Sequence, residues 1–339
     1  MSLANNNKKI KFIDLFAGIG GFHLAIHEVL HAECVCVSEW DKFARQTYKF
    51  NFDKISPKIF IEKPNTYSHI QSMMSNDFLG DITKIKPEEI PNHDVLCAGF
   101  PCQPFSLAGL KKGFSDTRGT LFFNVAQIIK IKKPKVVWLE NVKNLKNHDR
   151  GNTFQVIVNT LKELGYTIYS QVLNAKDYGL PQNRERIYII GFRNDIPIKK
   201  FCFPSKMLKK TRLGDILDKN VDDKYTISDK LWNGHQRRKK EHQSKGNGFG
   251  YCLFNEESQY TSTISARYYK DGSEILIEQK AKNPRKLSPR EALRLQGFPE
   301  WYEFPVSDNQ AYKQCGNSVA VPVLKCIAQQ IKKTGVFDN

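Results

Sequence analysis

Residues 11–22 read KFIDLFAGIGGF, and this stretch decides the fold. The apolar run 11–16 predicts a buried strand, the glycines after it a tight turn, and residues 20–31 a helix. Glycines at such a turn let a ligand approach the backbone and the first amides of the helix. The spacing is neither G-x-G-x-x-G nor a P-loop, which disfavours nicotinamide dinucleotides and nucleoside triphosphates as ligands.

Strands and helices alternate from this stretch through the first 190 residues. Further strands are predicted at 33–38, 94–98, 135–139 and 186–191, with helices at 41–50 and 152–164. This rhythm is typical of an α/β fold with a doubly wound, Rossmann-like sheet. Residues 53–76 are polar and irregular, and we expect them to form an insertion at one edge.

The sequence changes character after residue 192. Residues 193–290 carry 22 Lys and Arg against 12 Asp and Glu, which is +10 of the net charge of +17. We call residues 193–288 the basic region and expect it to be mostly β, with short strands at 261–265 and 274–277. The charge indicates a surface for a polyanion, with DNA and RNA equally open, although a solvated basic face is the alternative.

Helical periodicity returns at residue 288. Ser288 is a predicted N-cap, Pro289 the first helical residue, and a last helix is expected over 320–332.

Composition argues against several classes of protein. The 339 residues are 40% hydrophobic, yet no apolar run approaches the roughly 18 residues of a membrane span. The polar start predicts no secretory signal. Eight cysteines lie scattered without a C-x-x-C pair, so we expect reduced thiols and a cytoplasmic protein. His23, His27 and His31 repeat every four residues, but no carboxylate or cysteine motif accompanies them, so no metal site is expected.

Several polar residues follow predicted strands, where open α/β sheets hold their ligands. Cys102 lies in GFPCQPFS (99–106), directly after the strand 94–98; a buried structural thiol is the alternative. Glu39 follows the second strand, at the spacing typical of a ribose-binding carboxylate, and Trp40 beside it can stack on adenine. These two residues favour a cofactor that contains adenosine.

Glu140 follows an apolar run, where a carboxyl group holds its proton more readily and suits a general acid. A helix cap or an ion pair is the alternative reading. Arg184 and Arg186, two residues apart in QNRER (182–186), face the same side of a strand and suit an anion or a carbonyl oxygen. An ion pair between these arginines and Glu185 remains open.

Six motifs, in order and at similar spacing, resemble those of the DNA cytosine-5 methyltransferases, most closely the bacterial restriction–modification enzymes. They are the segments 12–22, 99–106, 140–142, 182–186, 285–299 and 316–319. The resemblance covers the chain except for 53–76 and most of 193–285.

The resemblance implies covalent catalysis, in which Cys102 attacks carbon 6 of cytosine and so makes carbon 5 reactive. Glu140 would bind and protonate ring nitrogen 3, and Arg186 would hold the cytosine carbonyl oxygen. Arg184 and Ser106 would lie near the catalytic loop and the DNA backbone.

The resemblance also implies S-adenosylmethionine as cofactor, with S-adenosylhomocysteine as its product. The implied cofactor-binding residues are Phe16, Gly18, Ile19, Gly21, Glu39, Trp40, Asp81, Ile82, Pro101, Leu121 and Asn317. Because Asn317 lies late in the chain, the last segment is expected to return to the first domain.

The implied domains are a catalytic domain (1–192, completed by 304–339), a target-recognition domain (193–288) and a hinge (289–303). Thr263 and Ile264 match the short signature of the recognition domain. Candidate DNA contacts are Arg237, Arg238, Thr263 and Arg267, besides Ser106. The expected partner is double-stranded DNA with a flipped-out cytosine. We expect a monomer without membrane contact, and a cognate restriction endonuclease acting separately fits this picture.

Three alternatives remain at this stage. A tRNA cytosine-5 methyltransferase shares the chemistry. A catalytically silent DNA-binding relative would lack it, which the presence of Cys102, Glu140 and Arg186 argues against. A Rossmann-type oxidoreductase is disfavoured by the glycine spacing at 18–21.

Overall fold

The computed structural model describes residues 9–60, 78–101, 121–207, 210–248 and 250–338. Its centre is a seven-stranded sheet in the order β3-β2-β1-β4-β5-β7-β6. The strands are β1 (Lys11–Leu15), β2 (Glu33–Ser38), β3 (Phe78–Leu79), β4 (Val95–Ala98), β5 (Val136–Val142), β6 (Tyr166–Asn174) and β7 (Glu185–Arg193).

Six strands of the sheet run in the same direction, and β7 runs against them. β1 pairs in parallel with both β2 and β4, and β4 pairs in parallel with β5. β7 runs antiparallel to both β5 and β6. The chain leaves β1 toward β2 and later returns beside it as β4, so the carboxyl ends of β1 and β4 flank the point where strand order reverses. Open α/β sheets bind ligands in the crevice at that point.

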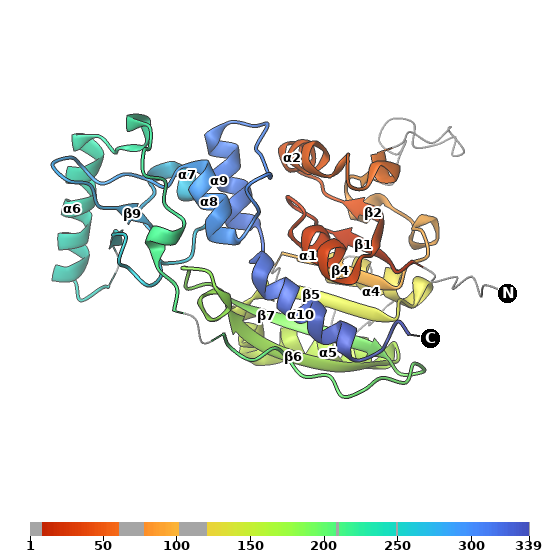
Figure 1. Cartoon of the computed structure of the whole chain (residues 1–339). Helices are drawn as coiled ribbons and strands as arrows, with labels where there is room; N and C mark the ends of the chain where they lie inside the picture. The colour runs from red at the N-terminus through yellow and green to blue at the C-terminus, as the bar shows by residue number, and fades with distance from the viewer. Residues whose placement is uncertain (1–8, 61–77, 102–120, 208–209, 249, 339) are drawn as a thin grey trace.

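Apolar clusters cover both faces of the sheet. One face carries α1 (Gly21–Leu30), which packs against α10 (Val321–Lys333) over Phe12, Cys97 and Trp138. The other face carries α4 (Leu121–Lys132) and α5 (Asn152–Glu163) over Leu96, Val137 and Ile189. In Figure 1, α10 crosses in front of β5 and β7. The predicted doubly wound α/β sheet is therefore confirmed, and the last helix does return to it.

The predicted elements of this domain match the structure closely, with three omissions. The predicted strand 33–38 has the bounds of β2, and the helix predicted at 41–50 is α2 (Lys42–Phe52), capped by the side chain of Asp41. Helix α4 and the strands β3 and β6 were not predicted. β6 is an edge strand in which seven of nine residues are at least partly exposed, and its exposure does not alternate along its length.

The basic region is less regular than expected and is not mostly β in the described residues. Its regular strands are β8 (Leu253–Phe254) and β9 (Leu276–Ile277), which pair with each other. Its longest element is helix α6 (Asp229–Ser244), with the short α7 (Tyr268–Asp271) beyond it. Ser228 caps α6, and lysine, arginine and glutamine along it favour a helix. Its lack of an apolar face hid it, since His235 is its one buried residue.

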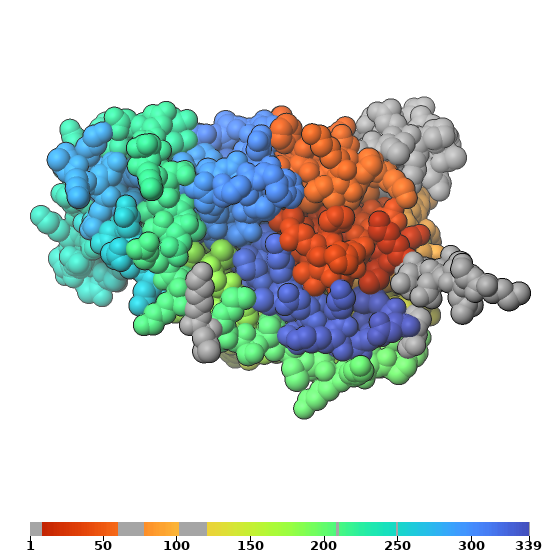
Figure 2. Space-filling view, viewed as in Figure 1, coloured from red at the N-terminus to blue at the C-terminus, as the bar shows by residue number. Residues whose placement is uncertain are grey.

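Helices α8 (Pro289–Gln296) and α9 (Asp308–Asn317) lie between the basic region and the sheet. Figure 2 shows these C-terminal residues, in blue, filling the junction between the green and cyan basic region and the red N-terminal part. Ser288 caps α8 as predicted and forms a capping box with Glu291.

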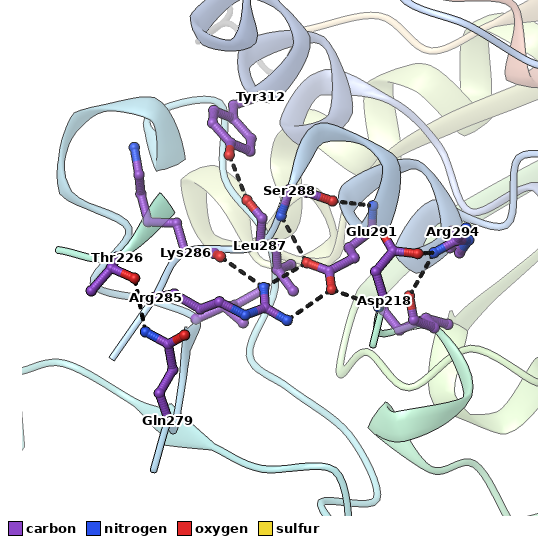
Figure 3. A network of polar contacts seen from close by, with 12 residues as sticks. Asp218, Thr226, Gln279, Arg285, Lys286, Leu287, Ser288, Glu291, Arg294 and Tyr312 are labelled. Carbon is purple, nitrogen blue, oxygen red and sulfur yellow. Dashed lines mark hydrogen bonds and ion pairs between the residues drawn. The ribbon is translucent and has the colours of Figure 1, made fainter. Parts of the chain in front are cut away.

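A buried polar network fastens the basic region to α8 (Figure 3). The Arg285 guanidinium donates to both carboxylate oxygens of Glu291, at 2.7 and 2.8 Å. Glu291 also accepts from the backbone N–H of Asp218 and of Ser288. One carboxylate thus joins two segments that precede α8 to the helix itself.

Candidate active site

A cavity of about 680 Å³ opens at the carboxyl ends of β1, β4 and β5. Its wall contains most of the residues predicted for cofactor and catalysis: Phe16, Gly18, Ile19, Glu39, Trp40, Asp81, Ile82, Pro101, Leu121, Glu140, Arg184, Arg186 and Asn317. These residues come from segments as far apart in the chain as Phe16 and Asn317. They meet because the carboxyl ends of parallel strands lie at one edge of the sheet.

One end of the cavity is built from the glycine turn and the end of β2. Gly18 has φ +56°, and a Cβ placed there would meet no atom within 4 Å, so its backbone borders open space. The Gly18 amide donates to Glu39 Oε2 at 2.7 Å, and the Asp41 amide donates to Glu39 Oε1 at 2.8 Å. Burial raises the pKa of Glu39 above its usual value, against these amide hydrogen bonds.

This end fits the adenosine part of S-adenosylmethionine. Glu39 is buried but borders the cavity, so its carboxylate is placed to accept from ribose hydroxyls. Trp40 is 80% exposed although it lines the same cavity. A large exposed aromatic face at a cavity is suited to stacking on a purine. Asp81, Ile82 and Asn317 close the wall around these two side chains.

The other end of the cavity holds a carboxylate and a guanidinium. Glu140 Oε1 lies 3.2 Å from Arg186 Nε, and both side chains are largely buried. Burial raises the pKa of Glu140, while Arg186 and Arg184 act in the opposite direction. A carboxyl group with a raised pKa can give a proton to a bound base. The fixed cation beside it can hold a neighbouring oxygen of the same base.

The part of the cavity wall next to Glu140 is held in place by the neighbouring residue, Asn141. Asn141 donates to the carbonyl oxygen of Phe100 at 2.8 Å and accepts from the Val142 amide at 2.8 Å. The segment that leads into residues 102–120 is therefore tied to β5, directly beside Glu140. Cys102 and Ser106 lie outside the described residues.

Arg184 borders the cavity, but its guanidinium donates hydrogen bonds to backbone carbonyl oxygens. It donates to the oxygens of Ile264 at 3.3 Å, of Gly316 at 3.2 Å, and of Ser318. Burial, and then the neighbouring Arg186, lower its pKa. The structure therefore shows Arg184 as a clamp behind the site, whereas Arg186 faces Glu140.

Gly21 and Thr263 do not line the cavity. Gly21 begins α1, and a Cβ there would come within 2.4 Å of Val319, so this glycine permits close helix packing. The Thr263 hydroxyl donates to the carbonyl oxygen of Asn183, in the segment before β7, at 2.6 Å.

The three candidate arginines of the basic region are all exposed, but two already have partners. Arg238 donates to His235 at 2.9 Å and lies 3.5 Å from Asp271. Arg237 lies 3.6 Å from Glu241 on the same helix. Both belong to α6, at the far end of the molecule from the sheet in Figure 1. Arg267 lies outside α6, directly before α7.

Residues of α9 that were not predicted from the sequence also line the cavity. Lys313 Nζ lies 2.7 Å from Asp41 Oδ2, and Gln314 accepts from the Thr47 hydroxyl at 2.9 Å. Both Lys313 and Gln314 line the cavity. Their position one helical turn before Asn317 was the available signal.

Of the three histidines in and after α1, His23 is the one that packs in the core. His23 is fully buried, with Nδ1 2.6 Å from the Tyr48 hydroxyl and Nε2 3.0 Å from Ser56 Oγ. Within the described ranges, no group of three His, Cys, Asp or Glu side chains is placed to hold a metal ion. In the same part of the chain, no helix has both the length and the apolar character needed to span a bilayer.

Comparison with known proteins gives one consistent result. The family model described as C-5 cytosine-specific DNA methylase matches residues 10–333. The chain is 57% identical to Type II methyltransferase M.SsoII of Shigella sonnei over 97% of this chain and 82% of the relative. It is 43% identical to Type II methyltransferase M.HhaI of Haemophilus parahaemolyticus, over 95% of this chain and 94% of the relative.

Solved structures agree on the fold. A mutant of Spodoptera frugiperda DNMT2 superposes with a TM-score of 0.72 at 22% identity, covering 98% of this chain and 100% of the other. S. pombe Dnmt2 gives a TM-score of 0.73 at 19% identity, covering 96% and 99%.

Proposed function

Because the chain belongs to the family of C-5 cytosine-specific DNA methylases, we propose how its own residues perform that family's reaction. The chain is a DNA cytosine-5 methyltransferase that uses S-adenosylmethionine, and the tRNA alternative is disfavoured. The observation that supports the assignment of roles is the Glu140–Arg186 pair, which borders the same cavity as Gly18, Glu39 and Trp40.

The nucleophile in this proposal is Cys102, which follows β4 by four residues. Its thiolate attacks carbon 6 of the target cytosine and forms a carbon–sulfur bond. The electron pair displaced from the ring double bond is accommodated as nitrogen 3 takes a proton. Carbon 5 thereby becomes nucleophilic, which splits one difficult step into two easier ones.

Glu140 gives the proton to nitrogen 3, because burial makes its carboxyl group hold a proton more readily than an exposed glutamate. Arg186 holds the cytosine carbonyl oxygen from the adjacent position, 3.2 Å from Glu140. S-adenosylmethionine supplies the methyl group that carbon 5 accepts. A base then removes the carbon-5 proton, the Cys102 thiolate is expelled, and nitrogen 3 returns its proton to Glu140, which restores the neutral aromatic ring.

The cofactor is held, in this proposal, by the residues that line the glycine-turn end of the cavity. Glu39 binds the ribose hydroxyls and Trp40 packs on adenine, with Asp81 and Ile82 beside it. Phe16, Gly18, Ile19, Pro101, Leu121 and Asn317 complete the pocket.

Target recognition belongs to the basic region, with residues 289–303 as the hinge and 304–339 completing the catalytic domain. Carbon 6 cannot be reached inside a duplex, so the cytosine leaves the stack at a cost of a few kcal/mol. The charge of the basic region supports a role in holding the DNA while this happens.

The biological setting we propose is a restriction–modification system, in which a cognate endonuclease is a separate protein. The similarity to Type II methyltransferases supports this setting. We further propose that the enzyme works as a monomer on cytoplasmic DNA. Light scattering on the purified protein tests the monomer, and resistance of methylated plasmid to restriction tests the pairing with an endonuclease.

The decisive experiment traps the covalent adduct. Bisulfite sequencing of plasmid from expressing cells first identifies the methylated site. A duplex with 5-fluorocytosine at that site should then form a denaturation-resistant complex with the wild type, because fluorine at carbon 5 cannot leave as a proton does.

The matched control for Cys102→Ser is Cys202→Ser, since Cys202 is an exposed free thiol that does not line the cavity. Cys202→Ser should form the adduct and Cys102→Ser should not. An adduct formed at the wild-type rate by Cys102→Ser would overturn the assignment of the nucleophile.

A further inference from the structure

Gln182 joins three segments of the chain through a single buried amide. It lies three residues before β7 and has no exposed surface. Its Nε2 donates to the carbonyl oxygen of Leu295, at the end of α8, at 2.9 Å. Its Oε1 accepts from the backbone N–H of Ile264, in the basic region, at 3.2 Å.

Further hydrogen bonds connect the same two strand-like segments, 181–184 and 261–264. Backbone bonds run from Asn183 to Thr261 and from Thr261 to Pro181, each 2.8 Å long. The Thr263 hydroxyl adds its bond to Asn183, and Arg184 adds its bond to the Ile264 oxygen. Residues 181–184, which lead into β7, are thus hydrogen-bonded to residues 261–264 of the basic region.

We call the hydrogen-bonded segments 181–184 and 261–264 the seam. The seam also contacts the wall of the cofactor cavity. Arg184 donates to the oxygens of Gly316 and Ser318, the two neighbours of Asn317. Gln296, which accepts from Gln182 at 3.4 Å, donates to the Cys315 oxygen at 2.7 Å. The segments that carry the base-binding and cofactor-binding residues therefore meet at Gln182 and Arg184.

We propose that Gln182 is a positioning residue that couples the basic region to Arg186. Its amide holds segment 261–264 in register with the strand that begins at Glu185, so the fit of DNA on the basic region sets the placement of the Arg186 guanidinium. This inference rests on the proposed roles of Arg186 and of the basic region. A glutamine suits the position because it donates and accepts at once, which neither glutamate nor methionine can do.

The test compares Gln182→Met with a second amide clamp, Asn51. Asn51 donates to the Glu303 oxygen at 2.8 Å and accepts from the Glu303 amide at 2.9 Å, and its described hydrogen bonds do not involve segment 261–264. Asn51→Leu therefore removes equivalent hydrogen bonds without touching the seam. Both variants should lose similar thermal stability, since each leaves buried backbone groups unpaired.

The expected result for Gln182→Met is a 10- to 100-fold fall in kcat on the cognate duplex, about 1.4 kcal/mol for each tenfold. The preference for cognate over single-mismatch sites should fall with it, while cofactor affinity stays within threefold. Asn51→Leu should keep kcat and site preference within threefold of the wild type. Should Gln182→Met fail to fold, Thr263→Val breaks a peripheral bond of the same seam and should give a smaller loss in the same direction.

A double-mutant cycle with Arg186→Lys shows whether Gln182 acts through Arg186. If it does, adding Gln182→Met to Arg186→Lys should cost much less than it costs the wild type. Two results would overturn the inference. One is that the kcat losses of Gln182→Met and Arg186→Lys multiply fully in the double variant. The other is that folded Gln182→Met keeps the kcat and site preference of the wild type. Failure of the proposed function would look different, because Arg186→Lys itself would then leave methylation unchanged.

Discussion

The central sheet and the basic region are stabilised by different kinds of interaction. Strand β4 is buried at every residue and has apolar clusters on both faces. The basic region has two-residue strands, and its buried ion pair with α8 is Arg285–Glu291, at 2.7 Å. Apolar burial is insensitive to direction, whereas an ion pair depends on the exact position of both partners. We therefore expect the sheet to be the robust platform and the basic region to be the part that salt, acid and single substitutions disturb.

The largest expected effect leaves both regions folded and removes only the chemistry. Glu140→Gln cannot supply the proton in the same way, so the rate of methyl transfer should fall by about 10²- to 10⁴-fold. Single-turnover transfer of a tritiated methyl group measures this rate. Thermal unfolding and cofactor affinity should match the wild type; a near-normal rate would contradict the acid role.

The next effect separates the two regions. Arg285→Met leaves the Glu291 carboxylate buried without its cation, which should destabilise the basic region by about 3–5 kcal/mol. Hydrogen exchange should increase across 216–218 and 285–291 and much less in β4. The matched double variant Arg285→Met/Glu291→Gln should recover part of that loss, since it removes both charges and keeps an acceptor oxygen for a backbone amide that Glu291 binds. Equal loss in the single and double variants would show that the ion pair is not the cause.

Acid should loosen the turn that follows α8 through a more exposed pair, Arg294–Glu300. The hydrogen bond from Arg294 lowers the pKa of Glu300 below its usual value of 4.5. The folded state therefore gains stability from this pair above about pH 4.5, and loses it as the pH falls through the lowered pKa. Because Glu300 is exposed, the loss should be at most about 1 kcal/mol. Hydrogen exchange at 294–300 between pH 7 and pH 3 measures it, and Glu300→Gln should abolish the local pH dependence.

The smallest effect concerns DNA affinity. If Arg237 contacts one phosphate, Arg237→Ala should reduce the log–log slope of affinity against salt by about 0.9. Lys58→Ala is the control, since Lys58 is an exposed cation paired with Glu33 on the sheet domain. An unchanged slope in Arg237→Ala, determined by fluorescence anisotropy, would place α6 outside the DNA-binding surface.

The sequence predicted the cavity better than it predicted the basic region, for physical reasons. Gly18, Glu39 and Glu140 each follow an apolar strand, so the rule that strand ends converge was enough to bring them together. Helix α6 has no apolar face, and its position depends on a cap at Ser228 rather than on periodicity. Arg184 and Arg186 are indistinguishable in sequence, and only the carbonyls that surround Arg184 separate the clamp from the residue facing Glu140.

The packing of α10 on α1 has a consequence for biosynthesis. Helix α1 and the glycine turn are made early, but α10, which packs on α1, and Tyr302, whose hydroxyl donates to the Ile19 oxygen, are made after the basic region. A nascent chain on the ribosome therefore presents the apolar side of α1 without its partner for most of translation. The cofactor cavity lacks Asn317 for the same period, so the chain should acquire methylating capacity only once synthesis has passed α10.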